Sequence, residues 1–82
     1  MLKMVKCDSN VSLKVDRVLV LVNGWEYFLE KTDKDDIAFG LVCGFEDELG
    51  SVYLPEIKPY IVSEAAPDVH DTLPAIGWEW KE

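Results

Sequence analysis

The side chains most able to do chemistry in this 82-residue chain are one histidine and two cysteines. His70 is a candidate general base, and Asp68 and Asp71 are the nearby carboxylates that would have to orient its ring. Cys7 or Cys43 could supply a nucleophilic thiol to such a base. Both cysteines lie in strand-like apolar stretches, so we expect them to be small buried residues. We therefore predict that the chain is not an enzyme and has no catalytic residues.

The sequence contains no recognisable metal or cofactor motif. The two cysteines lie 36 residues apart, without the second closely spaced pair that a zinc site needs. Asp33, Asp35 and Asp36 resemble the start of a calcium loop. Counted from Asp33, however, the sixth and twelfth positions are Ala38 and Gly44, where such a loop needs glycine and glutamate, so the pattern fails. There is also no glycine-rich phosphate loop, so we expect no metal and no cofactor.

Acidic residues are the unusual feature of the composition. Asp and Glu number 16 against 8 Lys and Arg, which gives a net charge of −8. Residues 1–40 carry seven acids and six bases, whereas residues 41–82 carry nine acids and two bases. A nucleic-acid binder needs a basic footprint, so direct binding of nucleic acid is disfavoured. The candidate partner-binding residues are four acids and three aromatics of the second half: Glu46, Asp47, Glu48, Glu56, Phe45, Tyr53 and Trp78.

Clustered carboxylates can imitate a phosphate backbone and attract a groove lined by lysine and arginine. Exposed aromatic side chains are typical anchors of such interfaces. We therefore predict a binding protein whose acidic face engages a basic protein partner, with Phe45, Tyr53 or Trp78 as the anchor. The alternative is a structural or homo-oligomeric accessory module. In that case the acids serve solubility, and residues 2–7 or 76–81 pair as edge strands between copies.

The elements that position these residues are predicted to be mostly strands. We expect one small domain, residues 1–82, of the α+β class and mostly β. It would contain an antiparallel meander with a hairpin at Asn23-Gly24, followed by an irregular proline-rich C-terminal third. Strands are expected at residues 2–7, 11–22, 25–31, 37–43, 51–54 and 76–81. Between them we expect an acidic turn at 44–50, one helical turn at 55–58 and irregular chain at 60–73.

The Asn23-Gly24 pair predicts a two-residue type I′ turn. That turn pairs three residues before it with three residues after it: Val22 with Trp25, Val20 with Tyr27, and Val18 with Leu29. One face of the hairpin would then be wholly apolar, and Asp16 would lie opposite Lys31. In the next strand, Ala38, Gly40 and Val42 form a face of small residues that leaves room for close packing by a helix or strand.

The N-terminus has two lysines within seven residues but no apolar run long enough for a signal peptide. The longest apolar run is Val18 to Val22, and a membrane span needs about 20 residues. We expect a cytoplasmic protein, in which a disulfide between the two cysteines would not form.

Residues 25–57 carry the run W-E-Y-F-L-E and then F-G-L-V-C-G-F-E-D-E-L-G. This pattern resembles the uncharacterised domain-of-unknown-function family number 2958, found on plasmids, phages and integrative elements. Pro55 stands where that family has serine, its N-terminal helical segment has no counterpart here, and the tail after Ile57 matches loosely. The resemblance implies a mobile-element accessory protein in a prokaryotic cytoplasm. Small acidic proteins of such elements often block host nucleic-acid enzymes, including restriction and CRISPR systems, and by analogy we expect an inhibitor or DNA mimic of the anti-CRISPR or anti-restriction kind. It supplies no catalytic residues.

Overall fold

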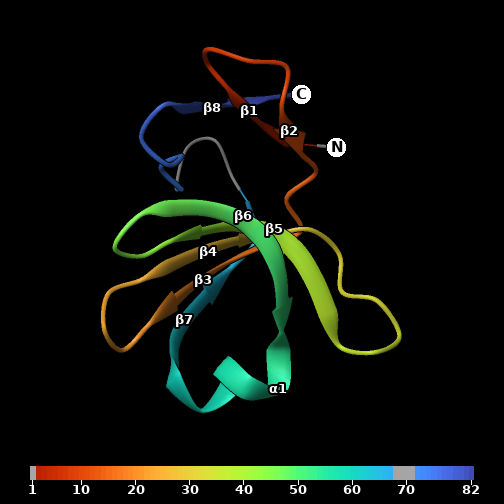
Figure 1. Cartoon of the computed structure of the whole chain (residues 1–82), viewed down its shortest axis with the longest axis vertical. Helices are drawn as coiled ribbons and strands as arrows, with labels where there is room; N and C mark the ends of the chain where they lie inside the picture. Colours follow the sequence, from red (N-terminus) through yellow and green to blue (C-terminus); the bar gives the residue numbers. More distant parts are fainter. Residues whose placement is uncertain (1, 68–71) are drawn as a thin grey trace.

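The computed structural model describes residues 2–67 and 72–82, which form two antiparallel sheets (Figure 1). The smaller sheet has the order β2-β1-β8, with β1 at Lys3–Lys6, β2 at Ser12–Leu13 and β8 at Trp78–Lys81. The larger sheet has the order β6-β5-β4-β3-β7. Its strands are β3 at Arg17–Leu21, β4 at Glu26–Leu29, β5 at Ile37–Cys43, β6 at Asp47–Tyr53 and β7 at Ile61–Ala65. The predicted mostly β class and the antiparallel meander are confirmed.

One face of the larger sheet packs against the smaller sheet. Phe28 of β4 is completely buried there, next to Leu41 of β5. Met4 of β1, Leu13 of β2 and Trp78 of β8 cover them from the smaller sheet. Alternate residues of each strand point to this face because the side chains of a strand alternate between its two sides.

In the described part of the chain, the opposite face of the larger sheet is covered by the segment between β6 and β7. This segment consists of one helical turn, α1 at Leu54–Ile57, and the 3-10 helix η1 at Lys58–Tyr60. The side chains of Leu54 and Ile57 pack on a core that contains Leu19, Leu29 and Ala38. The prediction of one helical turn is confirmed, and so is the expectation that the face of Ala38 receives a packed element.

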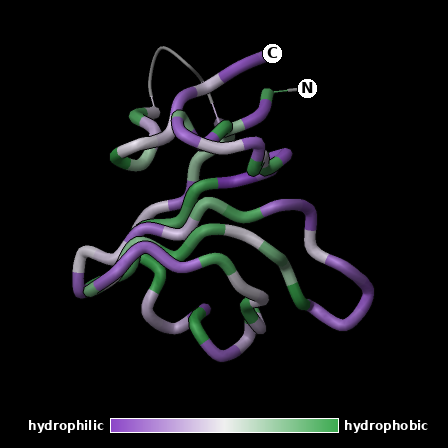
Figure 2. The backbone as a smooth tube through the Cα atoms, turned by 45° about the horizontal axis from the view of Figure 1, so that its top comes forward, coloured by the Kyte–Doolittle hydropathy of each residue, from purple (hydrophilic) through white to green (hydrophobic). Residues whose placement is uncertain are grey.

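Hydrophobic residues follow this arrangement along the chain. Figure 2 shows green, hydrophobic chain running through the middle strands of the larger sheet, with purple, hydrophilic chain in the long loop beside them. Among the described residues, no helix is long and apolar enough to cross a membrane.

The predicted register of the first hairpin is wrong by one residue. In the structure Val18 pairs with Phe28 and Leu19 with Tyr27, so the loop has three residues instead of two. Of these, Gly24 alone has a positive φ, of 86°, whereas a type I′ turn needs two such residues. The Gly24 amide donates to the Leu21 carbonyl at 2.8 Å, and the Leu21 amide donates to the Trp25 carbonyl at 2.9 Å. The apolar run before the turn fits either register because both faces of this hairpin are buried.

Two further segments differ from their predictions. The acidic turn is shorter than expected, because β6 already begins at Asp47 and pairs with Cys43 of β5. The segment predicted to be irregular contains β7, whose residue Ala65 pairs with Val18 on the outer side of β3. Because β7 pairs with a strand about 40 or more residues earlier in the chain, the local residue pattern does not predict it.

Candidate partner-binding surface

The predicted acidic cluster does not form one surface, because strand β6 divides it. Asp47 lies opposite Cys43, whereas Glu48 lies opposite Val42. Directly paired residues of antiparallel strands point to the same side of a sheet, and neighbouring residues point to opposite sides. Glu48 therefore faces the α1 side, and Asp47 faces the side of the smaller sheet.

On the α1 side, an open hollow of about 370 Å³ lies at the rim of the sheet. Its walls are Trp25, Val42, Phe45, Glu46 and Glu48. Phe45 is 95% exposed, which is unusual for so large an apolar side chain. Its ring meets the Trp25 ring edge-on, with the centroids 5.4 Å apart and the planes at 80°. Edge-to-face contact is a favourable geometry for two aromatic rings, so Trp25 supports Phe45 in its exposed position.

The local chain explains why Trp25 lies there. Gly44 follows β5, and a Cβ atom at this position would come within 2.7 Å of the Trp25 ring. The absence of a side chain therefore lets the indole pack directly on the backbone at Gly44. The backbone of Trp25 is also held, because its amide donates to Asn23 Oδ1 in the hairpin turn at 3.1 Å. The turn residues thus hold the indole between the two hairpin loops.

A second hollow, of about 410 Å³, lies on the other side of Trp25. It is lined by Tyr27 of β4, Glu56 and Ile57 of α1, and Tyr60 of η1, among others. Burial and then the nearby Glu56 carboxylate raise the pKa of Tyr27 above its usual value. Glu56 therefore reaches the same surface as Glu46 and Glu48, although it comes from a different element.

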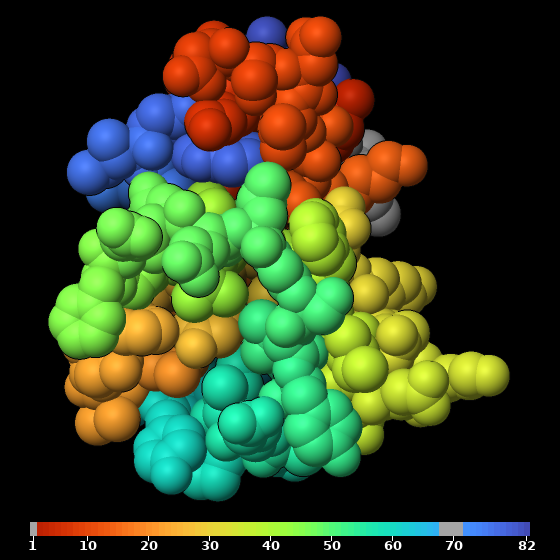
Figure 3. All heavy atoms as spheres, viewed as in Figure 1, coloured from red at the N-terminus to blue at the C-terminus, as the bar shows by residue number. Residues whose placement is uncertain are grey.

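We call this combined region the aromatic–acidic surface. Its members are the three aromatics around the two hollows that are at least partly exposed, which leaves out the buried Tyr27, and three acids: Trp25, Phe45, Tyr60, Glu46, Glu48 and Glu56. Figure 3 shows the chain near residue 45 in lime, the hairpin turn near residue 24 in orange and the chain near residue 60 in cyan. They follow one another down one side of the molecule. No lysine or arginine in the described part of the chain lines either hollow.

The structure excludes Trp78 from this surface. Only 7% of Trp78 is exposed, and it belongs to the core between the two sheets, so its prediction as an exposed anchor is wrong. Tyr53 is half exposed, but it ends β6 opposite Ile37, six residues along the strand from Asp47. Sequence reasoning missed Trp25, although its place directly after an Asn-Gly turn and its size made it a candidate anchor.

Cys43 is not placed to act as a nucleophile. Cys43 is partly buried, and its pKa is raised to about 12, first by burial and then by the Asp47 and Glu26 carboxylates. Its thiol therefore stays protonated at neutral pH and is a poor nucleophile. Cys7 is exposed, which corrects the prediction that both cysteines are buried. His70, Asp68 and Asp71 lie outside the described residues.

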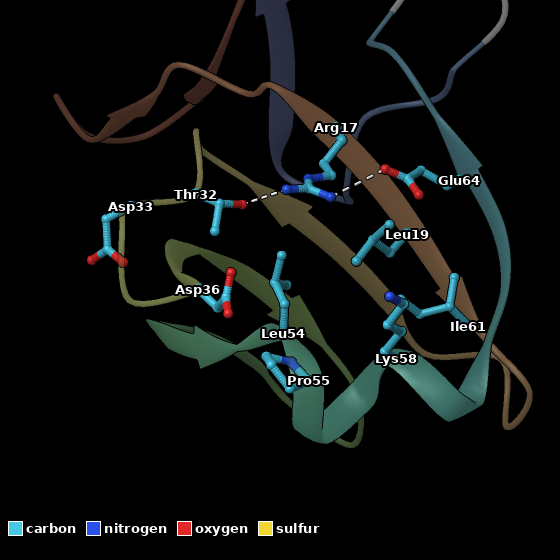
Figure 4. Close-up of a pocket in the computed structure, with 10 residues that line it drawn as sticks. All are labelled: Arg17, Leu19, Thr32, Asp33, Asp36, Leu54, Pro55, Lys58, Ile61 and Glu64. Carbon is cyan, nitrogen blue, oxygen red and sulfur yellow. Dashed lines mark hydrogen bonds and ion pairs between the residues drawn. The ribbon is translucent and has the colours of Figure 1, made fainter.

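A third hollow, of about 430 Å³, lies between the loop after β4 and the α1 segment (Figure 4). The Arg17 guanidinium there donates to Glu64 Oε1 at 3.2 Å and to the Thr32 hydroxyl. The Asp33 carboxylate accepts the backbone amides of Asp35 and Ile37. These polar groups bind one another and so join β3, β7 and the loop, which is a structural role. In the described part of the chain, no group of three or more acidic, histidine or cysteine side chains could hold a metal ion.

Comparison with known proteins adds no relative. No protein family, no curated protein and no solved structure matches the chain. The resemblance to the domain-of-unknown-function family stays a prediction.

Proposed function

We propose that this chain is a small, acidic, non-enzymatic binding protein that engages a basic surface of another protein through its aromatic–acidic surface. The observation that carries this proposal is the nearly complete exposure of Phe45, supported edge-on by Trp25 and flanked by Glu46 and Glu48. An apolar ring displayed to solvent in this way gains free energy when a partner covers it.

The charge of the surface favours a basic partner. Three carboxylates surround the aromatic rings, and the described residues of both hollows include no cation. The whole chain carries −8, most of it in the second half. A partner surface rich in lysine and arginine would therefore be attracted over long distances and at high rate.

Proteins that handle nucleic acids carry such basic grooves, since they must bind phosphates. We therefore propose a nucleic-acid enzyme of the host as the partner and inhibition by imitation of nucleic acid as the mechanism. The resemblance implies a mobile element in a prokaryotic cytoplasm as the source, and analogy with other small acidic proteins of such elements favours a restriction enzyme or a CRISPR effector as the target.

The test begins with capture of host proteins on the tagged full chain at low and at high salt, followed by mass spectrometry. We expect one basic nucleic-acid enzyme, which is retained at low salt, lost at high salt and displaced by duplex DNA. Retention that duplex DNA does not reduce would contradict imitation of nucleic acid.

Two variants of equal charge then locate the surface. Glu46→Gln with Glu48→Gln removes two charges from the aromatic–acidic surface, and we expect affinity to fall about tenfold at low salt. Asp47→Asn with Asp8→Asn removes two charges from residues that line a different hollow, beside Trp78, and should bind as the unchanged chain does. Equal losses in both variants would show that only net charge matters and would contradict this surface.

The aromatic anchor is tested separately. Phe45→Ala should weaken binding by about 2 kcal/mol or more, roughly 30-fold in Kd, because anchors contribute most of the energy of such interfaces. Its effect should persist at high salt, unlike that of the carboxylates. Unchanged affinity of the Phe45→Ala variant would remove Phe45 from the interface.

A further inference from the structure

Strand β6 forms one edge of the larger sheet and carries a row of unpaired backbone groups. The Leu54 amide donates to the Asp36 carbonyl at 2.9 Å, and the Gly44 amide donates to the Glu46 carbonyl at 3.3 Å. Hydrogen-bonded pairs alternate with non-hydrogen-bonded pairs along antiparallel strands. In the register of β5 and β6, these two bonds therefore mean that the even-numbered residues of β6 bond to β5. The odd-numbered residues turn their N–H and C=O groups outwards: Asp47, Leu49, Ser51 and Tyr53. In the described part of the chain, nothing bonds to these groups.

The same edge displays an apolar stripe on one face. Ile37 pairs with Tyr53, and Phe39 pairs with Ser51, so their side chains lie on the face of the smaller sheet. Ile37, Phe39, Leu49 and Tyr53 are between 36% and 51% exposed. Figure 3 shows the green chain of β6 uncovered at the front of the molecule. A long edge strand beside exposed apolar side chains is a template for pairing with another strand.

We propose that β6 pairs with β6 of a second copy of this chain, in antiparallel orientation and centred on Gly50. In this register Asp47 lies opposite Tyr53 of the second copy, Leu49 lies opposite Ser51, and Gly50 lies opposite Gly50. All four outward-facing residues then meet residues that also face outwards, as the hydrogen-bond pattern of antiparallel strands requires. The two apolar stripes lie on the same face of one continuous ten-stranded sheet.

Charge favours the antiparallel orientation of the second copy over the parallel one. The acids of β6, Asp47 and Glu48, lie at its start, and Val52 and Tyr53 lie at its end. Antiparallel pairing brings the acidic end of one copy to the uncharged end of the other, whereas parallel pairing would set acid beside acid. Gly50 lies at the centre of the pairing and brings no side chain to it. Even a Cβ atom at this position would meet no atom of its own copy within 4 Å.

This pairing is independent of the proposed function and responds to salt in the opposite way. Two copies of a chain with a net charge of −8 repel each other, so salt should strengthen the dimer while it weakens binding of a basic partner. Phe45 and Glu46 precede β6, and Glu48 within β6 faces the α1 side, so each dimer would present two aromatic–acidic surfaces.

Disulfide trapping tests the register. In a Cys7→Ser background, Gly50→Cys places two thiols at a non-hydrogen-bonded pair, where Cα atoms lie about 4.5 Å apart. This separation suits a disulfide, so mild oxidation should give a covalent dimer. Ser51→Cys in the same background is the matched control. Its two Cα atoms would lie diagonally, about 7–8 Å apart, and the thiols should link at least about tenfold more slowly.

A second pair of variants tests the backbone contacts without new thiols. Ser51→Pro removes an outward N–H that β5 does not use, so we expect an intact fold and a monomer in sedimentation at high salt. Ser51→Ala keeps that N–H and should remain dimeric.

Several outcomes would overturn the proposal. These are a monomer at every concentration and salt, equal self-association of the Ser51→Pro and Ser51→Ala variants, and faster linkage at residue 51 than at residue 50. Amides of β6 that are protected from exchange only after a foreign partner is added would assign the edge to that partner instead.

Discussion

The two faces of the larger sheet are covered by elements of very different size. On one face, three strands of the smaller sheet enclose Phe28 and Leu41 almost completely. On the other face, one helical turn and one 3-10 turn cover Leu19 and Leu29 but leave Trp25 only partly buried. So short a cover cannot span the whole face of five strands. The first face is closed at its centre but exposes the apolar stripe of Ile37, Phe39, Leu49 and Tyr53 at its β6 edge. The uncovered rim of the second face carries the aromatic–acidic surface.

The largest expected effect separates the two faces by stability. Phe28→Ala on the closed face should lower the free energy of unfolding by about 3–5 kcal/mol, since it leaves a cavity among completely buried neighbours. Phe45→Ala on the open rim should change it by less than about 0.5 kcal/mol, because that ring is exposed. Urea denaturation of both variants provides the measurement. A loss above about 2 kcal/mol for the Phe45→Ala variant would mean that the rim is part of the core.

Two glycines of the α1 face provide the next test. At Gly40 a Cβ atom would overlap the Phe28 carbonyl oxygen and come within 2.8 Å of Leu29 Cα. Because these are backbone atoms of the adjacent strand, we expect Gly40→Ala to destabilise the fold by about 1–3 kcal/mol or more. Gly50→Ala meets nothing within 4 Å and should be neutral or slightly stabilising. Thermal unfolding of the two variants compares them, and equal midpoints would contradict the close approach of β4 and β5.

The smallest effect concerns pH on the closed face. The pKa of Cys43 is raised from 9.0 to about 12, first by burial and then by Asp47. The folded state therefore holds the proton more tightly, so stability is complete below about pH 9 and falls as pH rises towards about 12. Cys43→Ala should lose less stability than the unchanged chain between neutral pH and about pH 10. Identical losses in urea denaturation would show that the thiol is not responsible and would point to Tyr27, whose pKa is also raised.

Some features follow from local residue patterns. The alternating residues of β1, the proline after Leu54 and the Asn-Gly turn placed a strand, a helical turn and a hairpin close to their observed positions. These elements depend on contacts between residues that are near in the sequence. The acidic and aromatic character of the candidate surface also follows from composition, because Phe45, Glu46 and Glu48 are neighbours along the chain.

Other features depend on which strands become neighbours, and the sequence alone does not determine that. The run Val18–Val22 is apolar at every position, so a shift of one residue exchanges one buried face for another at little cost. Only the three-residue turn and the covering elements select the observed register. Strand β7 exists because β3 offers it an edge from more than 40 residues away.

By itself the sequence determined a small acidic β domain, the position of its first hairpin and the residue types of a binding surface. Only the tertiary structure decided that Asp47 and Glu48 point to opposite faces, that Trp78 is buried and that Trp25 supports Phe45. The physical reason is the two-residue period of a strand. Neighbours in the sequence are separated by the sheet, and residues of distant strands are brought together on one face.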